Sequence, residues 1–94
     1  MNTIVVTRHQ ALINYLQEKG LISEDATILS HVTAEDVRGK RVIGVLPLHL
    51  AAEAREVIVI PLHTPPELRG VELSLEQVRQ YAGEPEIYRV QKIG

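Results

Sequence analysis

The sequence has no cysteine, tryptophan or phenylalanine, and its only aromatic residues are Tyr15, Tyr81 and Tyr88. Without cysteine there is no disulfide framework, no thiolate metal site and no cysteine nucleophile. Three scattered tyrosines do not supply the row of rings on which single-strand binders stack successive bases. No apolar run approaches the ~20 residues of a membrane span, so we expect a soluble protein with no membrane partner.

An excess of charge of one sign is also lacking, because 10 Lys and Arg against 12 Asp and Glu give a net charge of only −2. That balance argues against binding of long nucleic acid, which needs a broad basic stripe, but it permits a small anionic ligand held by a local cluster. The opening residues, MNTIVVTRH, do not fit a signal peptide, so a cytoplasmic location is expected.

A chain of 94 residues predicts one domain, residues 1–94. A chain of this size buries only about two-thirds of its unfolded surface, which leaves little room for a closed cleft within one copy. A site shared between two copies is easier to build.

Two apolar, β-branched runs, residues 42–46 and 57–60, flank an Ala-rich segment, residues 48–56. This order is typical of a βαβ unit, in which the two strands are parallel. Both runs are apolar almost throughout, so both faces of the sheet should be covered. Pro47 and Pro61 lack a backbone donor, and each should mark the end of its strand.

Residues 3–6 and 26–29 predict two further strands, and the alternating segment 86–93 predicts a last strand at an edge. Capping boxes at Thr7/Gln10 and Ser74/Gln77 predict two helices, and residues 33–38 fit one helical turn capped by Thr33. The fold class expected is α/β: a small Rossmann-like three-layer domain with a mostly parallel sheet of four to five strands. We expect strand order 2-1-3-4 and a site at the carboxyl ends of the strands.

Every histidine follows one of these strands within one to four residues, namely His9, His31, His49 and His63. Arg8 and Ser30 accompany them. If the strands are parallel, these side chains gather at one edge of the sheet, where open α/β folds bind ligands. The alternative for each is an ordinary loop histidine bonded to the backbone.

Two kinds of chemistry suit such an edge. Imidazole binds zinc, but no pair has the helical HxxxH spacing and Glu53 or Glu67 would have to complete the site, so no metal or other cofactor is expected. A phosphate-directed site fits better, because histidine transfers protons near neutral pH and arginine binds phosphate oxygens in a bidentate manner. The basic cluster at residues 38–41 has the composition of a solvated turn.

Four motifs together resemble one protein family: V-T-R-H at residues 6–9, S-H at 30–31, G-V-L-P-L-H-L-A-A-E at 44–53 and P-E-L-R-G-V-E-L-S at 66–74. The family is that of the short accessory proteins encoded beside type III CRISPR systems, of the ring nuclease kind. The resemblance implies a Rossmann-like homodimer that binds cyclic tetra-adenylate across its two-fold axis. It also implies that the ring is linearised without metal by its own 2′-hydroxyl, which switches off type III CRISPR signalling.

Roles for individual residues follow from chemistry within that resemblance. The residues expected to be catalytic are Arg8, His9 and His49, and those expected to bind the cyclic oligoadenylate are Thr7, Ser30, His31, Pro47, His63 and Arg69. Either His9 or His49 would assist proton transfer, and Arg8 would stabilise the charged phosphorane. Two alternatives stay open: a sponge or sensor that binds the ring without cutting it, and an interaction protein whose histidines are structural.

Overall fold

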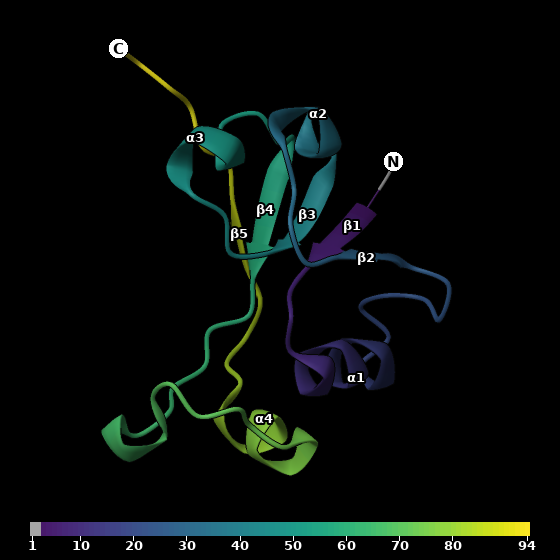
Figure 1. The fold of residues 1–94 in the computed structure, drawn as a ribbon, viewed down its shortest axis with the longest axis vertical. Coiled ribbons are helices and arrows are strands. Elements are labelled where there is room, and N and C mark those ends of the chain that lie inside the picture. The colour runs from purple at the N-terminus through teal and green to yellow at the C-terminus, as the bar shows by residue number, and fades with distance from the viewer. Residues whose placement is uncertain (1–2) are drawn as a thin grey trace.

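A computed structural model describes residues 3–94 and shows a five-stranded sheet with helices near both ends of its strands (Figure 1). Residues 1 and 2, which the expected domain also includes, lie outside that range. The strands are β1 (Thr3–Val6), β2 (Thr27–Leu29), β3 (Arg41–Gly44), β4 (Glu56–Val59) and β5 (Glu86–Tyr88).

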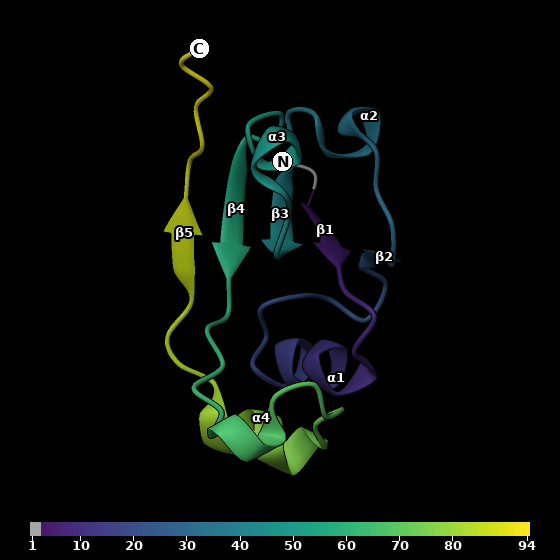
Figure 2. The same ribbon diagram turned by 60° about the vertical axis from the view of Figure 1, so that its left-hand side comes forward.

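The sheet order is β2-β1-β3-β4-β5. Strands β1 to β4 are mutually parallel, whereas β5 pairs antiparallel with β4 at the edge and points the opposite way in Figure 2. This confirms the predicted α/β class, the mostly parallel Rossmann-like sheet, the strand order and the edge position of the last strand.

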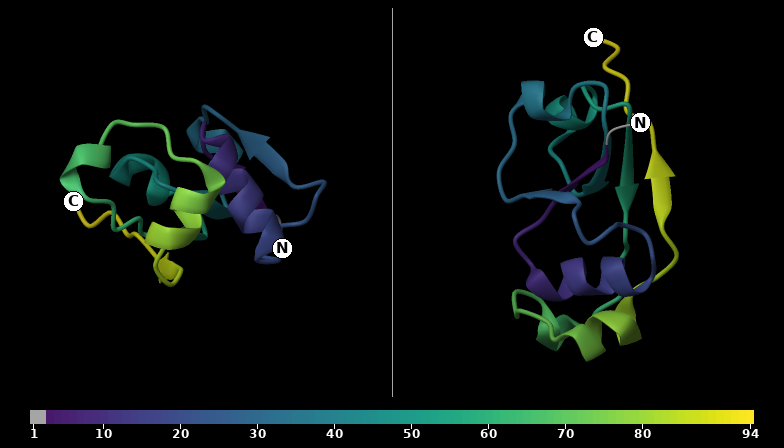
Figure 3. Two further views of the ribbon diagram at one scale, coloured as in Figure 1. Left: turned by 90° about the horizontal axis from the view of Figure 1, so that it is seen from below. Right: turned by 90° about the vertical axis from the view of Figure 1, so that its right-hand side faces the viewer.

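The helices alternate with the strands along the chain and are α1 (Gln10–Glu18), α2 (Ala34–Val37), α3 (Leu48–Ala51), the 3-10 turn η1 (Pro66–Leu68) and α4 (Leu75–Tyr81). Helices α1 and α4 lie side by side past the carboxyl ends of the parallel strands, whereas α2 and α3 lie toward the other end (Figures 2 and 3). Within residues 3–94 no helix combines the length and the apolar character that crossing a bilayer needs.

Alternation of side chains along the strands divides the core between the two faces of the sheet. On one face, strand residues such as Val5 and Ile43 pack with Leu16 of α1 and Val78 of α4. The opposite face carries a second cluster, whose buried members are Ile4, Val37, Val42, Ala51, Ala54 and Val57. Each face of the sheet thus carries a buried apolar cluster.

Two of the three predicted caps are formed. Ser74 N–H donates to Gln77 Oε1 at 3.0 Å and Gln77 N–H donates to Ser74 Oγ at 3.2 Å, which makes a reciprocal capping box for α4. Thr33 N–H donates to Asp36 Oδ2 at 2.8 Å at the start of α2. The Thr7 prediction is wrong, because α1 begins at Gln10 with His9 as its N-cap.

Three elements are shorter than predicted. Strand β3 ends at Gly44 and not at residue 46, α3 is one turn long and ends at Ala51, and β5 ends at Tyr88. Strand β4 pairs with β5 through only three residues, which limits β5 to the same length. Residues 45–47 are therefore an extended connection and not part of a strand.

Helices α1 and α4 are joined by an ion pair as well as by apolar contacts. Arg79 donates two hydrogen bonds to the carboxylate of Glu18, at 2.7 Å and 2.6 Å. This pairing lowers the pKa of Glu18 below its ordinary value and raises the pKa of Arg79.

Candidate functional site

The strand order reverses between β1 and β3. From β1 the chain passes through α1 to β2 on one side, and β3 and β4 then follow on the other side of β1. Such a reversal leaves a crevice at the carboxyl ends of the two strands, because the connections diverge to opposite faces of the sheet. The crevice between the ends of β1 and β3 is therefore the first place to look for a site.

An open hollow of about 580 Å³ occupies this position, and we refer to it as the rim crevice. Its polar wall consists of Thr7, Arg8 and His9, which follow β1, together with Ser30, which follows β2. Its remaining lining is main chain and apolar side chain, from Val6, Leu12, Ile43, Gly44, Val45, Ile60 and Leu62. Arg8, His9 and Ser30 are exposed to solvent.

Hydrogen bonds fix the main chain of the segment between β1 and α1. Thr7 N–H donates to the carbonyl of Leu29 at 3.0 Å, and His9 N–H donates to Thr7 Oγ1 at 3.1 Å. The carbonyl of His9 accepts the N–H groups of Leu12 and Ile13, which begin α1. Arg8 thus stands immediately before the positive end of a nine-residue helix, a position that suits a bound anion.

Gly44 brings the end of β3 close to β1. Its φ is +146°, and a Cβ built on it would collide with the main-chain carbonyl oxygen of Val6. Only glycine fits this position, since any side chain would meet rigid backbone. The floor of the rim crevice is therefore made of closely approaching main chain.

The structure brings together four of the residues expected at the site, Thr7, Arg8, His9 and Ser30. Arg69 lines a neighbouring cavity to which His9 also contributes. His31 directly follows Ser30 and is exposed, and Pro47 is exposed at the N-cap of α3.

His49 and His63 do not join this group. His49 lines a separate groove with Glu53 and Lys92, residues that precede β4 and follow β5. Because β5 runs antiparallel to β4, this groove lies toward the amino end of the parallel strands. The gathering of all four histidines at one edge is thus not formed in one copy, and the catalytic role expected for His49 stays a prediction.

The main chain of His63 is paired, with its N–H donating to the carbonyl of Tyr81 at 2.9 Å. Its ring packs on Gly83, where an added Cβ would come within 2.8 Å of Nε2. Within one copy His63 is held against the segment between α4 and β5, and its role toward a ligand also stays a prediction.

Sequence reasoning missed the apolar part of the site. Val45 lines the rim crevice although 78% of its surface is exposed, and Leu12 and Leu62 line it as well. Gly70 and Glu72, from the loop after η1, lie beside Arg8 and His9 in a small adjoining hollow. The Gly-Val-Leu-Pro sequence at residues 44–47 could have indicated this apolar part of the site, because it places an apolar residue directly after a strand.

Within residues 3–94, no three His, Asp or Glu side chains are grouped so that they could hold a metal ion. The polar side chains that line the rim crevice are an arginine, a histidine, a threonine and a serine.

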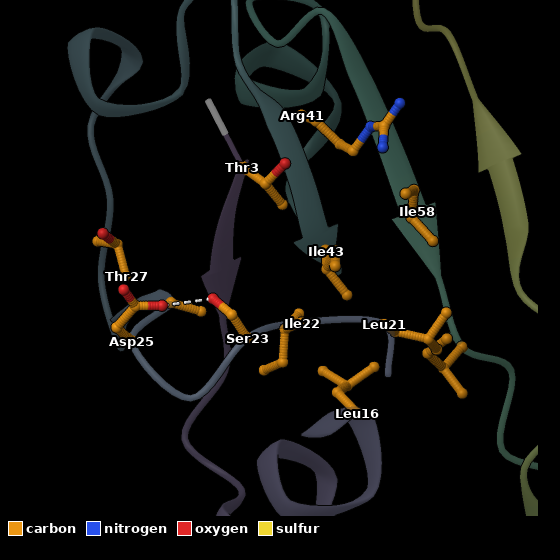
Figure 4. Close-up of a pocket in the computed structure, with 12 residues that line it drawn as sticks. Thr3, Leu16, Leu21, Ile22, Ser23, Asp25, Thr27, Arg41, Ile43 and Ile58 are labelled. Atoms are coloured by element: carbon orange, nitrogen blue, oxygen red, sulfur yellow. Dashed lines mark hydrogen bonds between the residues drawn. The ribbon is translucent and has the colours of Figure 1, made fainter. Parts of the chain in front are cut away.

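A second hollow, of about 470 Å³, lies on the sheet face next to the loop after α1 (Figure 4). Its floor is apolar, with Leu16, Ile43 and Ile58 among its members. The one cation that lines it, Arg41, is paired with Glu56 at 3.0 Å. This hollow contains no histidine and no free cation among its lining residues, so it suits a phosphate ligand less well than the rim crevice.

The fold and the rim crevice define a small Rossmann-like α/β protein with basic and hydroxyl side chains at the switch point of its sheet. The family model described as "Putative CRISPR-associated protein (Cas_VVA1548)" matches residues 4–91, and the chain belongs to this family. Comparison with curated proteins and with solved structures gives no match. The family confirms the CRISPR association that the four motifs indicated.

Proposed function

We propose that this CRISPR-associated protein binds cyclic oligoadenylate, above all cyclic tetra-adenylate, and linearises it as a metal-independent ring nuclease. The observation that carries the proposal is the grouping of Arg8, His9, Thr7 and Ser30 in one open crevice at the switch point of the sheet. A ring of adenylates presents phosphates and ribose hydroxyls, which are the groups that arginine, histidine and hydroxyl side chains bind.

The proposed reaction needs no external nucleophile. The 2′-oxygen of one adenosine attacks its neighbouring phosphorus, the bond from phosphorus to the 5′-oxygen of the next residue breaks, and a 2′,3′-cyclic phosphate forms. His9 takes the proton from the 2′-hydroxyl while water protonates the departing 5′-oxygen, or protonated His9 delivers a proton to the 5′-oxygen while water accepts the one from the 2′-hydroxyl. Arg8 and the first amide groups of α1 stabilise the negative charge that grows on the phosphorane.

Two copies of the chain supply the complete site in this proposal. The rim crevice is open on one side, and Val45 on its wall is 78% exposed. A two-fold interface that places one rim crevice against another would bury Val45 and would enclose a symmetric ring between identical halves. The wide, open shape of one crevice is then half of a closed site.

The test is incubation of the purified protein with cyclic tetra-adenylate in EDTA, with the products resolved over time. Linear fragments that end in a cyclic phosphate are expected. An intact ring that co-migrates with the protein would instead establish a sponge or sensor. Absence of both cleavage and binding would overturn the proposal.

A further inference from the structure

We propose that the cavity beneath the turn after β4 binds one adenine base of the ring; this inference rests on the function proposed above. The cavity, which we call the turn pocket, has a volume of about 260 Å³ and adjoins the rim crevice. Its ligand class is a purine base attached to a ribose phosphate.

The lining of the turn pocket matches a flat apolar group. Seven of its lining residues have apolar side chains and come from α1, from the segment after β4, from η1 and the segment after it, and from α4, namely Ala11, Leu12, Leu62, Leu68, Val71, Leu73 and Val78. Pockets for drug-sized ligands span about 300–1,000 Å³, so this cavity suits a single base and is small for a dinucleotide.

The turn pocket also has polar groups. His9, Thr64 and Arg69 line it alongside the apolar side chains. A hydroxyl group and a guanidinium group can hydrogen-bond the nitrogen atoms at the edge of a purine, and a guanidinium group can also stack on its face. A largely apolar cavity with a few polar groups is the usual composition of a small-molecule site.

The turn pocket and the rim crevice share His9, Leu12 and Leu62. One cavity is mostly apolar and the other contains Arg8, and a nucleotide likewise has a flat base and a charged phosphate joined through the ribose. A base in the turn pocket and a phosphate beside Arg8 would put the ribose, with its 2′-hydroxyl, next to His9. Because His9 lines both cavities, it would lie within reach of that 2′-hydroxyl in the proposed reaction.

The outer wall of the pocket can be altered without changing the core. Leu68 N–H donates to the carbonyl of Pro65 at 3.0 Å and Val71 N–H donates to that of Leu68 at 3.2 Å, so the turn is held by its own main chain. Leu68 is only half-buried and belongs to neither core cluster. A larger side chain at this position is expected to fill the pocket and to leave the fold intact.

The experiment compares Leu68→Trp with the wild type and with Leu21→Trp, a matched control at an exposed leucine on the other hollow. Isothermal titration measures binding of cyclic tetra-adenylate and, separately, of adenosine 5′-monophosphate. Leu68→Trp should weaken both by roughly tenfold to a hundredfold, the usual contribution of one base contact. Leu21→Trp should stay within about twofold, because it leaves the turn pocket unchanged.

The outcomes separate this inference from the proposed function. A ring that is still bound and cleaved, with Leu68→Trp matching the wild type, overturns the turn pocket and leaves the ring nuclease. Binding of the monophosphate without the ring supports the pocket and overturns the nuclease, and binding of neither overturns both. If Leu68→Trp does not fold, methyl resonances of the wild type decide: shifts of Leu68, Val71 and Leu73 on adding the monophosphate support the pocket, and unshifted resonances overturn it.

Discussion

The α-carbon of Gly44 lies so close to the main-chain carbonyl oxygen of Val6 that the position has no room for a Cβ. These two residues end adjacent parallel strands and are paired in register. Their contact forms the floor of the rim crevice at the point where the strand order reverses.

Gly44→Ala is therefore expected to destabilise the fold. The new Cβ meets backbone that cannot move aside, and the positive φ adds strain, so the free energy of unfolding should fall by about 3 kcal/mol. Gly20→Ala is the matched control, because Gly20 also has a positive φ but a Cβ there meets nothing within 4 Å. Its loss should be about 1 kcal/mol. Urea unfolding measures both, and equal losses would contradict the steric explanation.

The Glu18–Arg79 pair should make stability depend on pH. Because Arg79 lowers the pKa of Glu18 in the folded state, the stabilisation is present above the ordinary pKa of about 4.5 and is lost as pH falls through the lower, folded value. Glu18→Gln should thus lower the melting temperature at pH 7, and its difference from the wild type should shrink as the pH falls below 4.5. Glu24→Gln removes the same charge from an exposed loop and serves as the control. Equal effects of the two variants at pH 7 would contradict a role for the pair.

His9→Ala should lower the rate of ring cleavage by about a hundredfold or more, since loss of a general acid or base has that effect. Ring affinity should fall far less. His49→Ala provides the comparison, because His49 lines a different groove in the same copy. A rapid-quench assay with saturating ring measures the rates. A larger loss for His49→Ala would mean that the catalytic groove is the one beside residues 90–92.

Val45→Asp should dissociate the proposed dimer and weaken ring binding at least tenfold, because a buried unpaired carboxylate opposes association. Ile93→Asp is the control, since Ile93 is 94% exposed near the carboxyl terminus and lines no part of the rim crevice. Sedimentation velocity measures the association state of both variants. A dimer that survives Val45→Asp and is lost in Ile93→Asp would place the interface at the other end of the sheet.

Much of the sheet could be predicted from local composition. Residues 3–6 form β1 as expected, and Pro61 follows the last strand residues of β4, because β-branched runs and proline act over a few residues. The cap at Thr7 failed for a local reason: its Oγ1 accepts the N–H of His9, so the chain makes a tight bend before the helix begins. A threonine that caps a helix and a threonine that closes a bend before the helix have the same sequence pattern, so sequence alone does not distinguish them.

The grouping of residues in the rim crevice was predictable only where a residue follows its strand closely. Thr7, Arg8 and His9 follow β1, and Ser30 follows β2, so parallel strands place them at one edge. His49 was misplaced because the chain continues through the extended residues 45–47 into a helix of only one turn. Distance along the sequence then no longer indicates distance from the edge. The turn pocket was beyond sequence reasoning, since it depends on how η1 packs over α1 and α4.

The contact between α1 and α4 also affects the order in which parts of this protein can fold during synthesis. Glu18 and Arg79 are separated by 61 positions, and bringing together residues so distant in sequence costs loop-closure entropy. A chain still emerging from the ribosome can complete the parallel strands before α4 exists. The turn pocket, to which α4 contributes Val78, therefore cannot form until α4 has been synthesised. A nascent chain, or one shortened before α4, should consequently have the parallel strands but lack one wall of the turn pocket.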